Sequence, residues 1–422
     1  MNVEKNPPKR TTVIDAIRGF SLLGILMANI LIFQYGVYGK DELHLFNPTS
    51  WDLIGHDMLK IFVEGSFMPI FSFLFGFSMI KMKDSLTAKG LKFGRNIVRR
   101  SILLIILGFL HSLLWEGDIL LFYGTITFFL LMFVNRKPKT LMIWGSVFLL
   151  LSIGISYGSY NPTPEDAQRM MSYVKETIDL YGTGTYSEIM YHRINSDPLG
   201  LPGWVVPIVL FILVPLILGA LFLFGMAAAK RGRFMSPGTE KKLYLRYAVI
   251  CVPVGIAAKT MSVILGTGHT WSTLMQAAGG QILAIGYIYL FAFLYAHSSE
   301  KSVIVRSFEA VGRMSLTNYL MQTFICVLIF YGFGIGLFGK LGVLPGILLA
   351  LMIYTAQAVF SLLILNRFRI GPVEWLLRIG TYWSWSGRPK LRRQQNAAQV
   401  HPKTGAPLHK SPQDEITYTA KV

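Results

Sequence analysis

One apolar stretch of the sequence, residues 108–124, carries three ionisable side chains: His111, Glu116 and Asp118. Ionisable groups are costly in lipid, and those that occur there usually have a partner or a function. A carboxylate beside an imidazole fixes its tautomer, which suits a general base that takes a proton from a hydroxyl or amine. The stretch therefore predicts acid–base chemistry, with His111 as the base and Asp118 or Glu116 orienting it.

The same residues also have a purely structural interpretation. His111 and Asp118 are seven residues apart, which on a continuous helix is two turns and about 10 Å. Gly117 is expected to break the helix, so that either acid can fold back toward the imidazole. Alternatively, both acids belong to an ordinary loop, Asp118 caps the next helix and His111 binds a backbone carbonyl. The sequence leaves both interpretations open.

Asp15 and Arg18 are a second candidate pair, near the start of the first apolar segment. Their i,i+3 spacing on a helix favours a local ion pair. The alternative is that Arg18, close to the cytoplasmic face, binds a phosphate of a cytosolic ligand. Tyr123, at the end of the 108–124 stretch, is a further candidate for substrate binding.

Other polar residues fall inside apolar segments. Lys60 and Glu64 have i,i+4 spacing, which favours an ion pair between them. If Glu64 instead faces the interior, it joins Asn29 and His111 of the 108–124 stretch in one polar cluster. Asn318 and Gln322 also have i,i+4 spacing, and the simpler expectation is interhelical hydrogen bonding. We treat Asn29, Glu64, Asn318 and Gln322 as candidate binding residues.

The composition indicates a membrane protein that holds these residues on helices. The chain has 422 residues, of which 53% are hydrophobic and 15% are charged, against about 25% charged in soluble domains. The net charge of +18 does not indicate nucleic-acid binding, because Lys and Arg fall in short clusters between apolar runs. The two cysteines, Cys251 and Cys326, lie inside apolar runs, and no metal site or bound cofactor is expected.

Ten segments are long enough to cross a bilayer, which predicts an all-α polytopic bundle. They are roughly 14–34, 59–80, 101–116, 118–134, 140–158, 204–229, 245–265, 272–296, 316–335 and 342–366. The third and fourth form a tight hairpin. The first, which contains Asp15 and Arg18, is read as an uncleaved membrane helix rather than a signal peptide.

The distribution of basic residues predicts the orientation. With both termini in the cytoplasm, 32 of the 40 Lys and Arg lie on the inside, five lie outside and three lie within spans. This orientation places the turn of the hairpin outside. His111 then lies about 7 Å below the turn, in the outer leaflet.

Four regions follow from this layout: an N-terminal membrane bundle (1–158), an extracytoplasmic loop (159–203), a C-terminal membrane domain (204–385) and a basic, disordered cytoplasmic tail (386–422). The loop contains an amphipathic helix, which Thr163, Pro164 and two acids start. Pro372 and the nearby Trp and Arg residues predict an interfacial helix before the tail.

Several motifs together resemble the YeiB family of bacterial multipass proteins, whose C-terminal half is catalogued as a domain of unknown function, number 418. The resemblance spans about residues 10–390. Its marks are Asp15-Ala-Ile-Arg18-Gly19 with Asn29, Leu74-Phe75-Gly76, Gly108-Phe-Leu-His111 with Gly117-Asp118 and Tyr123-Gly124, Gly312-Arg313-Met314-Ser315-Leu-Thr-Asn318-Tyr319 with Gln322, and Gly371-Pro372-Val-Glu374-Trp375.

The family is similar, more distantly, to membrane acyltransferases of the heparan-glucosaminide acetyltransferase type. The resemblance implies a bacterial plasma-membrane protein that passes an acyl group from cytosolic acyl-coenzyme A to an envelope glycan, lipid or metabolite. Its expected partners are therefore the bilayer and such an acceptor, with acyl-CoA as co-substrate. The alternative is a transporter in which His111, Glu64 and Lys60 relay protons or bind a solute.

Overall fold

The computed structural model describes residues 11–157, 163–196, 198–199, 205–208, 213–266, 269–299, 302–387 and 389. These residues form sixteen α-helices and two 3-10 helices, and no strand occurs among them. The all-α prediction is confirmed.

In the first half of the chain the helices are α1 (Thr12–Tyr35), η1 (Gly39–Asp41), η2 (Leu43–Phe46), α2 (Ser50–Phe62), α3 (Phe67–Ala88), α4 (Phe93–Leu114), α5 (Leu120–Leu131), α6 (Pro138–Tyr157), α7 (Pro164–Thr183) and α8 (Tyr186–Asn195). The second half contains α9 (Val205–Ile208), α10 (Val214–Lys230), α11 (Lys241–Leu265), α12 (Thr270–His297), α13 (Val303–Arg313), α14 (Ser315–Phe330), α15 (Val343–Arg367) and α16 (Pro372–Tyr382).

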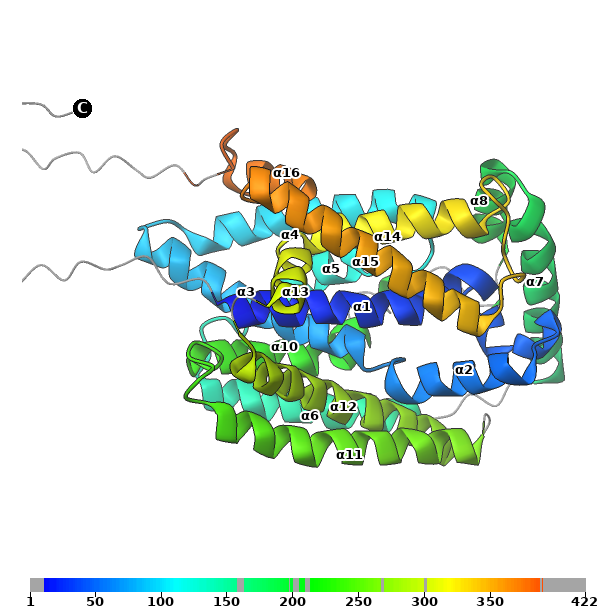
Figure 1. Cartoon of the computed structure of the whole chain (residues 1–422), viewed down its shortest axis with the longest axis horizontal. Helices are drawn as coiled ribbons and strands as arrows, with labels where there is room; N and C mark the ends of the chain where they lie inside the picture. The colour runs from blue at the N-terminus through cyan, green and yellow to red at the C-terminus, as the bar shows by residue number, and fades with distance from the viewer. Residues whose placement is uncertain are drawn as a thin grey trace, which may run out of the picture. The chain divides into compact units, whose positions relative to one another are not determined.

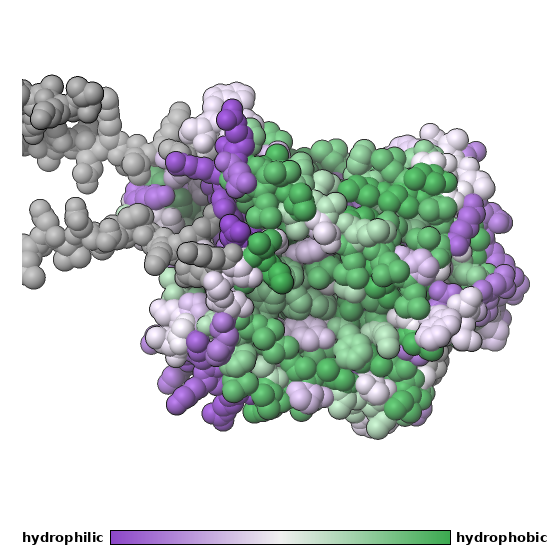
Figure 2. Space-filling view, viewed as in Figure 1, coloured by the Kyte–Doolittle hydropathy of each residue, from purple (hydrophilic) through white to green (hydrophobic). Residues whose placement is uncertain are grey.

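The chain is a membrane protein by the length and composition of these helices. Within the described residues, seven helical segments are long and apolar enough to cross a bilayer, and one of the seven covers α2 and α3 together. Three further apolar helices, α5, α10 and α14, are shorter. On the face seen in Figure 2, hydrophobic residues form a band along the middle of the bundle, and hydrophilic residues gather at its two ends. The number of ten spans and the cytoplasmic termini stay predictions.

Helix α1 lies inside the bundle and contacts α3, α12, α13, α14 and α15 (Figure 1). It is apolar around most of its circumference, as a helix surrounded by other helices should be. Glycines let α13 approach it closely: a Cβ atom on Gly312 would lie 1.8 Å from the carbonyl oxygen of Asp15, and one on Gly19 would lie 2.0 Å from that of Phe308. This crossing brings the end of α13 to the start of α1.

Helices α4 and α5 form the predicted hairpin, with residues 115–119 between them. A Cβ atom on Gly108 would lie 2.3 Å from the backbone nitrogen of Leu121, and one on Gly124 would lie 2.9 Å from that of Ile105. The two glycines that bound the motif therefore allow the backbones of α4 and α5 to pack directly together.

The two ends of the bundle carry different elements (Figure 1). The connection from α3 to α4 and the helix α16 lie at one end, which we call the basic end, and α7 and α8 lie at the other. Helix α7 begins as predicted: Thr163 and Asp166 form a reciprocal capping box, with Pro164 in the first turn. The helix predicted from Pro372 is present as α16, and its position at the membrane interface stays a prediction.

The predicted span 59–80 is broken. Helix α2 ends at Phe62, and α3 begins at Phe67 after a turn in which Gly65 adopts φ +70°. The fully buried Lys259 of α11 donates from Nζ to the carbonyl oxygen of Glu64 at 2.5 Å and to Ser66 Oγ at 3.1 Å. An ammonium group thus satisfies backbone that the break leaves without helical partners.

The chain divides into two units, residues 1–390 and 391–422, and every described residue belongs to the first. Nearly all of the predicted tail lies outside the described residues. The division of the first unit into two membrane regions and an external loop stays a prediction.

Candidate functional site

The structure pairs His111 with Asp118. The Nδ1 atom of His111 lies 2.7 Å from Oδ1 of Asp118, and both side chains are buried. The pair forms because α4 ends at Leu114 and the turn brings Asp118 back beside the last turns of α4. The other carboxylate oxygen of Asp118 accepts a hydrogen bond from the backbone nitrogen of Leu121 at 2.9 Å. Asp118 therefore both caps α5 and orients the imidazole, as the two sequence interpretations separately proposed.

Glu116 has a different partner set. Tyr181 of α7 donates a hydrogen bond to its carboxylate at 2.6 Å, and Arg193 of α8 forms an ion pair with it at 3.3 Å. Burial and the neighbouring Glu116 carboxylate both raise the pKa of Tyr181, so its hydroxyl stays protonated and keeps donating. Arg193 also donates to the carbonyl oxygens of Ser112 and Leu113 at the end of α4. Glu116 thus connects α7 and α8 to the hairpin and does not form an ion pair with His111.

The second imidazole nitrogen is available. Nε2 of His111 is buried and has no hydrogen-bond partner among the residues that the structure describes. The rings of Tyr319 and Trp115 flank the imidazole, with centroids 5.2 and 6.2 Å away. With Nδ1 donating to Asp118, Nε2 carries a lone pair, which is the state of a general base.

Further buried polar atoms without described hydrogen-bond partners include Trp115 Nε1, both side-chain polar atoms of Gln34 and the Tyr331 hydroxyl. Trp115 stacks on Phe33, the neighbour of Gln34, with ring centroids 4.2 Å apart. Buried polar groups are nearly always satisfied, so such atoms point to ordered water or a ligand near them.

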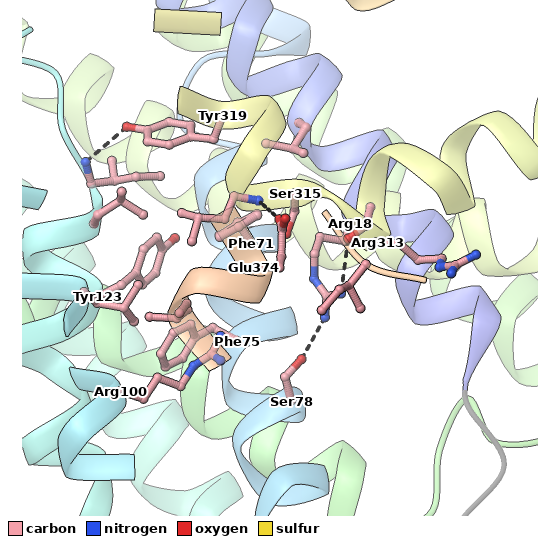
Figure 3. Close-up of a pocket in the computed structure, with 18 of the residues that line it drawn as sticks. Arg18, Phe71, Phe75, Ser78, Arg100, Tyr123, Arg313, Ser315, Tyr319 and Glu374 are labelled. Carbon is pink, nitrogen blue, oxygen red and sulfur yellow. Dashed lines mark hydrogen bonds between the residues drawn. The ribbon is translucent and has the colours of Figure 1, made fainter. Parts of the chain in front are cut away.

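A cavity of about 260 Å³ lies on the basic-end side of the His111–Asp118 pair. Figure 3 shows residues that line this cavity. Its polar lining includes Arg18, Ser78, Arg100, Glu374 and Arg378, and its apolar lining includes Leu22, Phe71, Phe75 and Leu104. The side chains come from α1, α3, α4 and α16, with Ile119, Tyr123 and Tyr319 from the hairpin and α14. Helices distant in the sequence therefore build one chamber.

The charge of this cavity is strongly positive. Arg18 is bound to Asp15 at 3.0 Å and donates to Ser78 Oγ at 2.8 Å. Arg100 and Arg378 have no carboxylate partner in the described part of the chain. Several guanidinium groups at one cavity, with few acids, favour a ligand that carries phosphate or another anion.

Among the described residues that line the cavity, Glu374 is the one carboxylate, and it binds the backbone of α14. It accepts from the backbone nitrogens of Leu316 and Thr317 at 2.7 and 3.1 Å and from the Thr317 hydroxyl at 2.6 Å. A carboxylate at a helix N-terminus is favourable because of the helix dipole. Glu374 therefore fixes α16 beside the cavity, and it forms no ion pair with the cavity arginines among the described residues.

Tyr319 links the cavity to the His111–Asp118 pair. It lines the cavity, its ring faces the imidazole, and its hydroxyl accepts a hydrogen bond from the Ile119 backbone nitrogen at 3.3 Å. Arg100 and His111 lie eleven residues apart on α4, which corresponds to about 16 Å along the helix axis. The arginines and the imidazole are thus at different depths, with an apolar and aromatic lining between them.

Of the other predicted binding residues, Tyr123 lines the cavity and its hydroxyl lies 3.2 Å from Ser72 Oγ. Asn318 donates to Ser361 of α15, and Gln322 donates to Gln357 of α15 at 3.0 Å. These two make the interhelical hydrogen bonds that the sequence favoured, and neither lines the cavity.

The expected ion pair between Lys60 and Glu64 was wrong, and the expected polar cluster of Glu64, Asn29 and His111 is not supported. Glu64 binds Lys40 at 2.6 Å, while Lys60 pairs with Asp41 at 3.6 Å, because α2 ends before Glu64 and the i,i+4 relation is lost. Its ion pair with Lys40 holds Glu64 in a cluster that does not include His111. Asn29 is half-buried in α1 and is not part of the cavity lining.

Four polar cavity residues stood neither among the candidate site residues nor in the motifs: Ser78, Arg100, Arg369 and Arg378. Arg100 and Arg378 stood only among the basic residues counted for topology. A signal was nevertheless present for Arg100, because it lies three residues after Ile97 and four before Leu104, which places it on the apolar face of α4. Tyr319 and Glu374 stood in the motifs without an assigned role.

The chain has relatives over nearly its whole length. A family model described as "Protein of unknown function (DUF418)" matches residues 228–384. "Uncharacterized protein YxaH" of Bacillus subtilis (strain 168) is 34% identical over 391 residues, which cover 89% of this chain and 95% of that protein. "Uncharacterized protein YeiB" of Escherichia coli (strain K12) is 27% identical, covering 88% of this chain and 96% of that protein.

An "Uncharacterized 39.9 kDa protein in amylase 3'region" of Bacillus acidopullulyticus is 26% identical over 89% of this chain and 94% of its own length. No solved structure matches the chain significantly. Because these matches cover 88–89% of this chain, they extend beyond the residues of the family model into the N-terminal half that carries His111. The chain belongs to the YeiB-like family, whose C-terminal part is the DUF418 domain.

Proposed function

We propose that this protein is a transmembrane acyltransferase of the bacterial plasma membrane. The observation that carries the proposal is the buried His111–Asp118 pair, whose free Nε2 lies one aromatic side chain away from an arginine-lined cavity. A base at one depth and an anion site at another match a substrate that has a phosphate-bearing end and a distant reactive end.

The donor in this proposal is a cytosolic acyl-CoA thioester. The positive-inside rule assigns the basic end of the bundle to the cytoplasm, where Arg18, Arg100 and Arg378 would bind its phosphates. The apolar wall formed by Phe71, Phe75 and neighbouring residues would then receive the pantetheine arm and the acyl group. The thioester would approach Tyr319 and the imidazole.

The acceptor is an extracytoplasmic glycan, lipid or metabolite with a free hydroxyl or amine. His111 Nε2 takes the proton of that group as its oxygen or nitrogen attacks the thioester carbonyl carbon, and the carbon–sulfur bond breaks. The sulfur leaves as coenzyme A thiolate, and the imidazolium returns the proton to it. Asp118 stabilises the imidazolium while it exists, because its carboxylate is held 2.7 Å from Nδ1.

Mass profiling of lipids and cell-wall glycans tests the proposal. A deletion strain is expected to lose a mass of one acyl group from an envelope component, and the wild-type gene is expected to restore it. A His111→Gln gene should not restore it, although the protein accumulates in the membrane. An unchanged envelope profile in the deletion strain, together with no acyl transfer from acyl-CoA in wild-type membranes, would contradict the proposal.

One observation favours a second function, transport. Broken membrane helices form ion- and solute-binding sites in many transporters. Here the break lies between α2 and α3, and the buried Lys259 ammonium binds the carbonyl oxygen of Glu64 within it. Proton-gradient-dependent flux in vesicles that contain the purified protein but no acyl-CoA would support this function. Loss of that flux in Lys259→Met, but not in His111→Gln, would separate it from acyl transfer.

A further inference from the structure

A second cavity lies away from the proposed active site. It has a volume of about 250 Å³ and shares no lining residue with the cavity around Arg18 and Arg100. Its sides are formed by α6 and α11, and α10 and α12 contribute the residues between them. The walls are mostly apolar, with Met142, Leu149, Phe224, Ala228, Ile285 and Ile288 among them.

Guanidinium groups stand at one end of this cavity. Arg231 and Arg233, in the turn after α10, belong to its lining. Arg233 is paired with Glu240 at 2.9 Å, whereas Arg231 is exposed and has no ion pair in the part of the chain that the structure describes. The lining therefore combines an exposed cation that has no ion pair among the described residues with buried and half-buried apolar side chains.

The surroundings match the edge of a bilayer. Residues 230–246 contain six Lys and Arg and one acid, and Lys230 donates to the carbonyl oxygen of Arg136 in the neighbouring basic turn. Figure 2 shows hydrophilic residues at this end of the bundle and hydrophobic ones along its sides. Beside the cavity, α6 and α11 expose large apolar side chains, among them Ile143, Leu150 and Val249. Such faces lie in lipid, so the cavity opens where acyl chains and headgroups meet.

We propose that this cavity binds one membrane phospholipid with an anionic headgroup. Arg231, with Arg233 beside it, holds the phosphate, and one acyl chain enters between α6 and α11. Basic pockets between membrane helices on the cytoplasmic side are recognised sites for anionic lipids. A soluble phosphate compound would leave the apolar walls unfilled, and a folded partner would not enter a cavity of this size. The site is independent of acyl transfer.

Lipid titration of the purified, full-length protein, followed by native mass spectrometry, tests the proposal. Wild type is expected to bind phosphatidylglycerol more tightly than phosphatidylcholine. Arg231→Gln should weaken phosphatidylglycerol binding about fivefold and phosphatidylcholine binding by less, because the choline cation of phosphatidylcholine offsets the charge of its phosphate. Lys242→Gln is the matched control, because Lys242 is exposed in the same basic region but does not line the cavity.

Filling the apolar part tests the acyl chain separately. Ala228→Leu places a larger side chain in the cavity and should weaken the binding of both lipids, with the thermal unfolding midpoint confirming that the variant is folded. Equal affinity of wild type for the two lipids, or equal weakening by Lys242→Gln and Arg231→Gln, would overturn the site. Displacement of the lipid by free glycerol phosphate would overturn the lipid as its occupant, as would unchanged binding in a folded Ala228→Leu protein.

Discussion

The imidazole of His111 and the carboxylate of Asp118 meet at 2.7 Å across the end of one helix and the start of the next. The same carboxylate caps α5 through the Leu121 backbone nitrogen. Because one side chain performs both tasks, the geometry of the base depends on the local fold of the hairpin rather than on distant contacts. The predictions below separate chemistry at this pair from the integrity of the hairpin.

Replacing the base should abolish activity without unfolding the protein. His111→Gln is expected to lower acyl transfer from acyl-CoA by about 10²- to 10⁴-fold, the range for loss of a general base. Asp118→Asn should also lower the rate, since the imidazole loses its carboxylate. Rates are measured in membranes that contain equal amounts of each protein. His297→Gln, at an exposed position on α12, is the control and should leave the rate unchanged.

Removing an unpaired guanidinium should weaken donor binding and leave the chemistry intact. Arg100→Gln is expected to raise KM for acyl-CoA roughly ten- to hundredfold, with little change in kcat, because a charged hydrogen bond to a phosphate is worth about 1.5–3 kcal/mol. Arg95→Gln, on the exposed face of the same helix, should behave as wild type. A fall in kcat with unchanged KM would show that Arg100 does not bind the donor.

A methyl group at Gly108 should force the hairpin apart. Its Cβ would lie 2.3 Å from the Leu121 backbone nitrogen and 2.8 Å from Asp118 Oδ2, so Gly108→Ala should destabilise the protein by about 1–3 kcal/mol and reduce activity. Thermal unfolding in detergent and the acyl-transfer rate are measured together. Gly94→Ala on the same helix, where a Cβ atom meets nothing within 4 Å, should change stability by less than about 1 kcal/mol.

The cluster around Asp41 predicts an acid-side loss of stability. Partial burial alone would raise the pKa of Asp41, but the Lys40 and Lys60 ammonium groups outweigh it and lower this pKa from its ordinary value of 3.8. Since the folded pKa is the lower one, the stabilisation is present above the unfolded pKa and is lost as pH falls through the folded pKa. Wild type should therefore lose stability below about pH 4 more steeply than Asp41→Asn.

Thermal unfolding midpoints between acidic and neutral pH check this difference. Asp179→Asn removes an exposed carboxylate of α7 and should retain the wild-type slope. Parallel curves for wild type and Asp41→Asn would show that the cluster contributes no pH-dependent stability.

Local patterns in the sequence were enough to predict much of the scaffold. Apolar runs of bilayer length predicted the membrane helices, Thr163 and Pro164 predicted the start of α7, and Gly117 predicted a break between α4 and α5. These signals arise from contacts between residues within about four positions of one another, and such contacts recur in every helix. The pairing of His111 with an acid belongs to the same class, because the hairpin is a local structure.

Tertiary structure alone decided which side chains share a cavity. Arg18 and Arg378 lie 360 residues apart in the chain, and both line the chamber because α1 and α16 each pack near α14. Glu64 illustrates the opposite case: its spacing favoured Lys60, but the break after Phe62 turned it toward Lys40. Hydropathy and capping determine where helices begin and end. Close contacts such as those at Gly19 and Gly312 determine which helix faces meet. A single sequence does not specify those contacts.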